Sequence, residues 1–576
     1  MCSACTSKKS RLAIYQVNNK RNGLAESLFI KCSFCGVKNF FFSSKKVAGS
    51  GGAFVVNRKS VLASSSRQKL GKFCAKLDLP APVHKEPYNR HLRMIEKAVV
   101  QEAEGKMIDA ANRLKAIIQK EQPENITIED GKEIGEVAVS VDGSWQKRGY
   151  TSKIGVVFVL SVRTGEVLDY EVLSHYCHAC IAHDSMDKES VEYKDWLAKH
   201  AVDCQVNHKG SSGDMENKGA IAMFKRSIAK RSLKYTTFVG DGDSSCFGNV
   251  SEAVKVAHGD SYQITKEECV GHIQKRMGTA LDAYKKSMRG KKLNDGKGVG
   301  GAGRLTQDVI KRIQNYYGFA IRQNKGDLDG MVKAITAIQH HVIQEPSKSL
   351  SFQHRFCPKG KDSWCNFRRE AATSDKEHHE SNRLPQVFLS ALAPIFKRLS
   401  NSELLSRCLL GLTQNQNESL NGRLWNLIPK SSFCGKRRVV IAVCETISIS
   451  NTGAASKATV AEILGVEVGE NMLRALRNED ITRLKNAARK ISIKYRNRRK
   501  ILKFARNKKK AKVVSYKAGS FGTGVTPDVA AAVIKKKKIV KRKKKEIVKK
   551  TRKAPKFVTF VNEDIDIMQV SFYQKP

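Results

Sequence analysis

The sequence predicts a mixed α/β core joined to a mostly helical region and flanked by small metal-binding modules. Three observations predict this. Strand-like alternation begins at Glu136, helical periodicity dominates after about residue 290, and closely spaced cysteine pairs occur outside both regions and within the core. A chain of 576 residues is also too long for one compact core, so several folded parts are expected.

The charge of the chain is the strongest compositional signal. The formal net charge is +49, and residues 491–556 alone hold 26 Lys and Arg against Asp528 and Glu546. Globular surfaces rarely depart so far from neutrality, so we expect a polyanionic partner, with nucleic acid first and a ribosome-associated or merely adhesive basic protein as the alternative. No apolar run approaches the roughly 18 residues that span a bilayer, so a soluble, intracellular protein without a membrane partner is expected.

Residues 1–44 predict a zinc ribbon. Cys2-x-x-Cys5 and Cys32-x-x-Cys35 each place two thiols on a short turn, and two such turns complete a tetrahedral zinc site. Fifteen cysteines in an intracellular protein favour metal sites over disulfides, although unpaired thiols remain the alternative for this set.

The next two segments differ in composition. Residues 45–89 are rich in Ser, Gly, Lys and Pro and predict a linker. Residues 90–135 predict a helical connector, because apolar side chains recur at helical intervals from Arg90 to Gln119.

Residues 136–290 predict the α/β core. Three consecutive strands are expected, then a helix, a strand, a helix and a last strand, at residues 137–141, 154–162, 166–173, 220–230, 235–240, 250–256 and 262–265. This order is that of a ribonuclease-H-like fold, in which the first and fourth strands are neighbours. Other α/β arrangements share the order, so the order alone does not decide the fold.

An insertion at residues 174–210 interrupts this core and predicts a second zinc site. Its ligands would be Cys177 and Cys180 together with His200 and Cys204, which lie one helical turn apart; His208 is a reserve ligand. Four protein ligands leave no open coordination position, so the zinc would be structural.

Acidic residues follow two of the predicted strands. Asp142 comes after the first strand, and Asp241 and Asp243 come after the fourth. Adjacent strand ends would bring two carboxylates over one cavity, where Mg²⁺ or Mn²⁺ would relieve their repulsion. Asp241 stands directly at the strand end and is preferred to Asp243.

The remainder of the chain divides into three parts. Residues 291–410 predict a mostly helical insertion, 411–490 the C-terminal part of the core, and 491–576 a disordered basic tail. The tail includes the block KKKKIVKRKKK at 535–545, which is typical of a nuclear-import signal or a phosphate-binding arm, so we expect the nucleus as the location. A solvated charge run without a receptor is the alternative.

Five ordered blocks carry a family resemblance. They are DGSWQKRGYTSKIG (142–155), NHKGSSGDMENKGA (207–220), VGDGDSS (239–245), ECVGHIQKRMG (268–278) and TQNQNESLNGRLW (413–425). Together they resemble the Mutator-like transposases of animal mobile elements, close to the Kolobok group, over roughly residues 1–460.

The resemblance implies an Asp-Asp-Glu active site. Glu418, on an expected helix whose apolar face holds Leu420, Leu424 and Trp425, is the best match for the third carboxylate. The implied chemistry is two-metal phosphoryl transfer, with hydrolytic nicking of element ends followed by strand transfer into target DNA, by a homo-oligomer on DNA.

Cys269-x-x-His272 resembles a signature that several transposase superfamilies carry after the second aspartate. The pair would bind metal or, as we favour, pack beside the active site, and Lys275 and Arg276 directly after it would contact phosphates. Two other functions stay open: a domesticated, catalytically silent zinc-dependent DNA-binding protein, and a nuclease without strand transfer.

Overall fold

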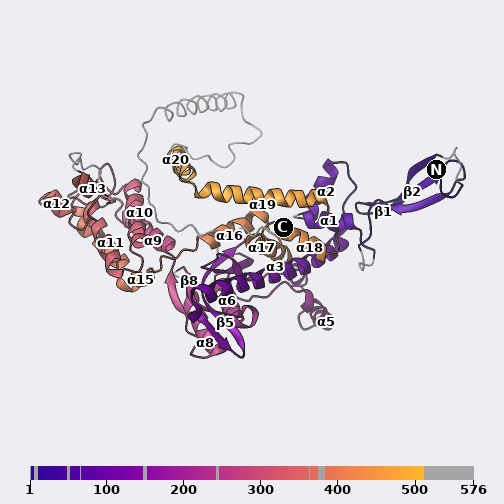
Figure 1. Ribbon diagram of the computed structural model, residues 1–576, viewed down its shortest axis with the longest axis horizontal. Helices are drawn as coiled ribbons and strands as arrows, with labels where there is room; N and C mark the ends of the chain where they lie inside the picture. The colour runs from indigo at the N-terminus through magenta and orange to yellow at the C-terminus, as the bar shows by residue number, and fades with distance from the viewer. Residues whose placement is uncertain are drawn as a thin grey trace, which may run out of the picture. The chain divides into compact units, whose positions relative to one another are not determined.

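The computed structural model describes residues 2–5, 11–47, 52–64, 66–146, 152–241, 245–361, 363–373 and 383–510 (Figure 1). The chain divides into two units, Met1–Arg483 and Leu484–Pro576. Among the described residues, no helix is long and apolar enough to cross a membrane.

The N-terminal segment forms a three-stranded antiparallel sheet in the order β1-β2-β3. The strands are β1 (Leu12–Asn22), β2 (Ala25–Cys32) and β3 (Lys38–Phe42). The turn between β2 and β3 contains Cys35, and Cys32 ends β2, so the sheet presents one cysteine pair at one of its ends.

The sequence predicted a linker at residues 45–89, but this segment contains two helices, α1 (Val55–Ala63) and α2 (Arg67–Lys76). Val61 and Leu70 are buried in the apolar core that these helices share with α3 (Lys85–Glu121). The buried Arg58 donates from Nη1 to the Leu464 carbonyl at 2.7 Å. The local composition does not predict these helices, and they are stabilised by packing of their apolar side chains against the rest of the first unit.

A six-stranded mixed sheet lies at the centre of the first unit. Its strands are β4 (Ile126–Glu129), β5 (Lys132–Trp145), β6 (Ile154–Ser161), β7 (Val167–Ser174), β8 (Leu233–Gly240) and β9 (Thr265–Glu268). The order is β7-β6-β5-β8-β9, with β4 paired to β5. The β5–β8 and β8–β9 pairs are parallel, whereas β6 runs antiparallel to both β5 and β7.

Two details of this sheet differ from expectation. The last strand begins at Thr265 rather than at Tyr262, whose ring is buried in the core and whose hydroxyl accepts from the Tyr235 backbone N–H at 2.5 Å. Asp142 lies within β5 rather than after it, because β5 keeps pairing with β6 as far as Trp145.

Helices pack against the sheet through two apolar clusters. One cluster joins β6 and β7 to α3, α16 (Asn415–Leu427), α17 (Lys436–Asn451) and α18 (Ser456–Ile463). The other joins the sheet to the C-terminal part of α3, to α6 (Asp214–Lys225) and to α8 (Cys246–His258), with α7 (Ser227–Arg231) beside them. The Cys/His-rich insertion after β7 contains α4 (His178–Ala182) and α5 (Val191–His200).

The region after β9 is mostly helical and has its own apolar core. Its helices are α9 (Val270–Ser287), α10 (Gln307–Gln323), α11 (Leu328–Val342), α12 (Leu350–Gln353), α13 (Asn366–Thr373), α14 (Val387–Leu399) and α15 (Ser402–Ser406). Leu293 and Val299 from the Gly-rich segment are buried in the same core, so this segment packs against the helices that it connects.

The C-terminal helices are α19 (Glu470–Ile491) and α20 (Ile493–Lys510). The first part of the tail that we expected to be disordered, residues 493–510, is therefore helical. The rest of that tail, including the basic block at 535–545, lies outside the described residues.

Candidate functional site

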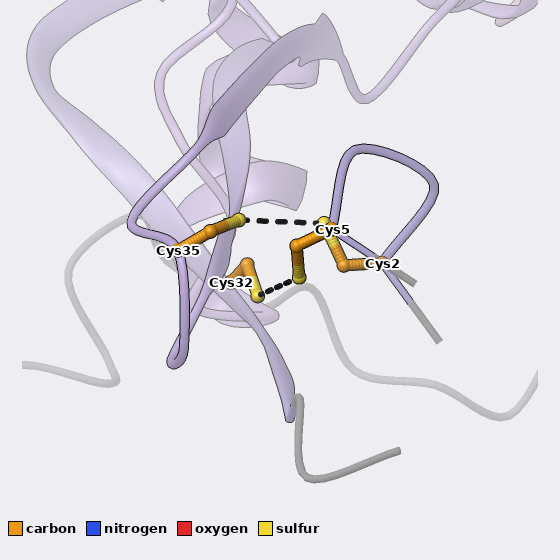
Figure 2. A group of neighbouring side chains, drawn as sticks. All are labelled: Cys2, Cys5, Cys32 and Cys35. Carbon is orange, nitrogen blue, oxygen red and sulfur yellow. Dashed lines mark hydrogen bonds between the residues drawn. The ribbon is translucent and has the colours of Figure 1, made fainter. Parts of the chain in front are cut away.

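The four cysteines of the first predicted zinc set lie together at the end of the N-terminal sheet. Figure 2 shows their sulfur atoms facing one another. The Sγ atoms of Cys2 and Cys35 are 3.7 Å apart, and those of Cys5 and Cys32 are 3.9 Å apart. Two sulfurs held tetrahedrally by zinc at about 2.3 Å would be about 3.8 Å apart, so the cluster has the dimensions of a zinc site. Hydrogen bonding by the backbone N–H of Cys35 lowers the pKa of Cys32 to about 6, which favours the thiolate that zinc requires.

The second predicted set also comes together, from α4, α5 and the residues that flank these helices. The Nε2 atom of His200 lies 3.3 Å from Cys177 Sγ and 3.4 Å from Cys180 Sγ, and the Cys180 and Cys204 sulfurs are 3.6 Å apart. The Trp196 ring stacks on the His200 imidazole at 4.8 Å and holds its orientation. Both clusters can therefore bind zinc.

His208, the reserve ligand, takes no part in this cluster. It is buried, and its Nε2 lies 3.1 Å from the Ser211 carbonyl oxygen.

The first two carboxylates stand at matching positions on adjacent parallel strands. The last register pair between β5 and β8 is Ser140 with Val239, and Asp142 and Asp241 each lie two residues farther along the chain. Because parallel neighbours are about 4.8 Å apart, these aspartates occupy one edge of the sheet. Asp243, the alternative second aspartate, lies outside the described residues.

Asp142 lies in a strongly acidic environment. Burial, followed by the charges of Glu216, Glu418 and Asp241, raises its pKa to about 7, against the opposing effect of a hydrogen bond from Asn421. Burial likewise raises the pKa of Glu216, on α6, and the Asp241 charge adds to the effect. Such mutual repulsion among carboxylates is what a bound cation relieves.

His272 lies between the second aspartate and the candidate third carboxylate. Its Nδ1 is 3.7 Å from Asp241 Oδ2, and its Nε2 is 3.7 Å from Glu418 Oε1. The two carboxylates are about half exposed, whereas the imidazole is one-fifth exposed. The imidazole thus connects the strand end to the helix that carries Glu418.

Helix α16 is fixed on the sheet by amide side chains. Asn421 Nδ2 donates to Asp142 Oδ2 at 2.6 Å, Gln414 Nε2 to the Val141 carbonyl at 2.6 Å, and Asn417 Nδ2 to the Ser140 carbonyl at 3.2 Å. The predicted apolar face of this helix exists, with Leu420 and Leu424 buried against the sheet and Trp425 partly buried beside them. Its first turn therefore brings Glu418 to the carboxylates of Asp142, Glu216 and Asp241, and we call these four carboxylates at the strand ends the acidic edge.

Cys269 and the basic residues after it lie on α9 or at its start. The buried Cys269 sulfur accepts a hydrogen bond from the Gln414 backbone N–H at 3.3 Å, and so attaches the start of α16 to α9. Lys275 Nζ donates to Glu418 Oε1 at 3.1 Å, and Arg276 Nη2 lies 3.7 Å from Asp241 Oδ1. The side chains of Lys275 and Arg276 thus face the carboxylates as well as the solvent.

A cavity of about 690 Å³ opens beside these groups. It is lined by Asp241 from the strand end and by side chains from three helices of the helical region, which are His272, Lys275 and Arg276 on α9, Arg398 and Leu399 on α14, and Leu404 on α15. Three basic side chains in its wall suit an anionic ligand.

Three functional features were not predicted from the sequence. Glu216 lies within a block that carried the family resemblance, and its place on the acidic edge comes from the packing of α6 against β5. Asn421 belongs to another such block. The third feature is a further Cys/His group formed by His341, His354, Cys357 and Cys365 in the helical region.

The carboxylates differ from the Cys/His groups in their spacing. Within the described residues, the sets whose ligand atoms all lie within 4.8 Å of one another are the three Cys/His clusters, and the carboxylates are not among them. The carboxylate oxygens of the acidic edge are therefore farther apart than the ligand atoms of a single metal ion with all its ligands in place.

A family model described as Mutator-like transposase matches residues 1–365. No curated protein and no solved structure matches the chain. The match covers well over half of the 576 residues and spans the strands that carry Asp142 and Asp241 as well as all three Cys/His clusters. A transposase acts on DNA, which agrees with the net charge of +49. On this evidence the chain belongs to the Mutator-like transposase family.

Proposed function

We propose that the protein is a DDE-type transposase, or a descendant of one, that nicks element-end DNA and joins it to target DNA with Mg²⁺ or Mn²⁺. The observation that carries the proposal is the matched position of Asp142 and Asp241 on neighbouring parallel strands, approached by Glu418 from α16. Family membership supplies the DNA substrate.

The topology supports a ribonuclease-H-like core as the scaffold. Along the path β7-β6-β5-β8-β9, β6 alone runs against the other four strands. This is the strand order expected of such a core. It places the first and fourth strands of the core, β5 and β8, side by side.

The donor chemistry fits a hard divalent cation. Asp142, Asp241, Glu216 and Glu418 offer carboxylate oxygens. Burial and, after it, the charges of the other three raise the pKa of Asp142. When bound, such cations supply activation of the attacking hydroxyl and stabilisation of the leaving oxygen. The width of the acidic edge agrees better with carboxylates distributed over two ions than with three on one.

The protein's own side chains have distinct tasks in this proposal. Asn421 orients the Asp142 carboxylate, and His272 keeps Asp241 and Glu418 on either side of one ring. Lys275 and Arg276, which balance the carboxylate charge in this structure, would turn to DNA phosphates once cations occupy the acidic edge.

The two predicted Cys/His clusters are proposed to hold structural zinc. Neither has an open position, because all four ligands come from the protein in each. We also propose that the protein is nuclear and acts on DNA as a homo-oligomer. A fluorescent fusion lacking residues 535–545 should lose nuclear accumulation, and light scattering of the DNA complex should give more than one chain.

The decisive assay mixes the purified protein with Mg²⁺, labelled element-end DNA and a target plasmid. Joined product supports the transposase, cleavage without joining identifies a nuclease, and binding alone identifies a domesticated DNA-binding protein. Asp142→Ala, Asp241→Ala and Glu418→Ala should each reduce nicking and joining by at least ~100-fold while DNA binding is retained.

The matched control is Glu252→Ala, which removes an exposed carboxylate from α8. It should leave both reactions unchanged. Normal joining by the Glu418→Ala protein would remove Glu418 from the active site.

A further inference from the structure

We infer that His341, His354, Cys357 and Cys365 form a third structural zinc site, within the helical region. His341 lies in the last turn of α11, His354 caps α12, Cys357 follows in a turn, and Cys365 directly precedes α13. The inference depends on these four side chains alone and stands whether or not the proposed catalytic function holds.

The distances match those of a tetrahedral zinc site. The Nδ1 atoms of His341 and His354 are 3.2 Å apart. Cys357 Sγ lies 3.7 Å from His341 Nδ1 and 3.6 Å from His354 Nδ1. Cys365 Sγ lies 3.3 Å from His354 Nδ1. Bonds of about 2.0–2.1 Å to nitrogen and 2.3 Å to sulfur give tetrahedral separations of about 3.3 Å between nitrogens and 3.6 Å between sulfur and nitrogen.

Burial distinguishes this group from a chance gathering on the surface. His354 is 1% exposed, Cys357 4% and Cys365 0%. Two imidazole nitrogens that approach to 3.2 Å can share one proton at most, whereas a cation accepts both lone pairs. Two thiolates and one Zn²⁺ are together neutral, so the ion can be buried at little electrostatic cost.

Aromatic rings surround the ligands. The Phe367 ring stacks on His354 at 4.7 Å, and Trp364 contacts His341 edge-on at 4.8 Å. Such rings exclude water and fix the orientation of the imidazoles, as the groups around structural metal sites do. Because all four ligands come from the protein, the ion would have no open coordination position for a substrate.

The site has a clear structural task. Between the end of α11 at Val342 and the start of α13 at Asn366, the short helix α12 is the one helix that the structure describes. A zinc ion held by ligands from both ends and the middle would close this segment onto α11. The segment contains Lys348 and Arg355, and Arg368 follows on α13, so its opening can be detected with trypsin.

Metal analysis of the full-length protein tests the site directly. We expect three zinc ions per chain by elemental mass spectrometry, two in the His341→Gln protein, and three in the His340→Gln control. His340 neighbours His341 on α11 but pairs with Glu345 at 3.0 Å, outside the cluster. The difference between the proteins decides the matter, since it does not depend on the other two clusters: equal zinc contents of His341→Gln and the unmodified protein would overturn the inference.

Cysteine footprinting gives a second test that does not depend on a variant folding. Cys357 and Cys365 should resist alkylation until chelator removes zinc, and should then react together. Cys408, a buried cysteine of the same apolar core that lies outside the cluster, should stay protected throughout. Alkylation of Cys357 with all zinc retained, or a Cys357–Cys365 disulfide in the purified protein, would refute the site.

Limited proteolysis tests the structural role. Trypsin should cut at Lys348, Arg355, Lys359, Lys361 or Arg368 in His341→Gln much faster than in His340→Gln, with equal cutting outside this segment. Equal rates at these positions in both proteins would contradict closure of the segment by zinc.

Discussion

At Asp142, the backbone and the packing act on the same carboxylate. Strand β5 places it at the acidic edge, and Asn421 donates to its Oδ2 at 2.6 Å. Burial first, and then the nearby negative charges, raise its pKa to about 7. Asn421 lies 279 residues from Asp142 in the sequence, so this hydrogen bond forms only when α16 packs on the sheet in the position described.

Asn421→Ala should lower Mg²⁺-dependent nicking by about 10–100-fold, because the Asp142 carboxylate loses the donor that orients it. The effect should appear in kcat and in the Mg²⁺ concentration for half-maximal rate, with DNA affinity unchanged. Asn415→Ala, an exposed position in the first turn of the same helix, serves as control. Equal activity of the two variants would show that Asn421 does not position the site.

A second prediction concerns Gly143. A Cβ at this position would lie 2.7 Å from Glu216 Oε2 and 2.9 Å from its Cδ, in the partly buried space between β5 and α6. Gly143→Ala should therefore displace the Glu216 carboxylate from the acidic edge and destabilise the protein by about 1 kcal/mol, at the low end of overpacking because the contacted atoms end a flexible side chain. Urea unfolding measures the decrease in stability.

The matched change is Gly248→Ala in α8, where an added Cβ meets nothing within 4 Å. It should be neutral or stabilising by about 0.4–1 kcal/mol, because alanine restricts the unfolded chain. A cost at Gly248 equal to that at Gly143 would show that removal of glycine itself, not the contact with Glu216, is responsible.

At the scale of elements, α16 brings a catalytic candidate to the sheet and also helps to build the core. Leu424 is fully buried with β6 and α17, on the same helix as the half-exposed Glu418. One packing defect should therefore change both stability and activity.

Leu424→Ala should cost about 2–5 kcal/mol of unfolding free energy, because it leaves a cavity between helix and sheet. Nicking should fall as Glu418 loses its fixed position. Leu410→Ala, at a leucine that is 54% exposed, should change stability by less than about 0.5 kcal/mol. Unchanged urea midpoints in both variants would mean that α16 is not packed as described.

At the scale of the whole molecule, charge governs the encounter with DNA. The net charge of +49 has two sources, the basic body and the tail, and counterion release makes binding by either depend on salt. A protein ending at Lys510 lacks the block at 535–545 and should bind non-specific DNA more weakly at low salt.

The slope of log affinity against log salt should become shallower in this truncated protein, by about 0.9 for each DNA phosphate that the tail neutralises in the full-length chain. Fluorescence anisotropy over a salt series measures the slope. A Gly/Ser tail of equal length is the control, since it keeps the length and removes the charge. An unchanged slope would mean that the folded body alone binds the phosphates.

Features that depend on neighbours along the chain could be predicted before the fold was known. Ligand pairs such as Cys2 and Cys5 can be predicted because a spacing of two to four residues fixes the geometry of the pair. The strands of the core can be predicted because apolar residues alternate along them. The five family blocks were readable for the same reason, and the family match confirms the resemblance that they carry.

Features that depend on distant segments became visible in the folded chain alone. The fold places Glu216 against Gly143, Asn421 on Asp142, and His341 beside Cys365, and it makes two packed helices of the expected linker. Local spacing cannot give these contacts, because each is set by how helices pack on the sheet or on one another. The packing is in turn determined by apolar surface contributed from the whole first unit.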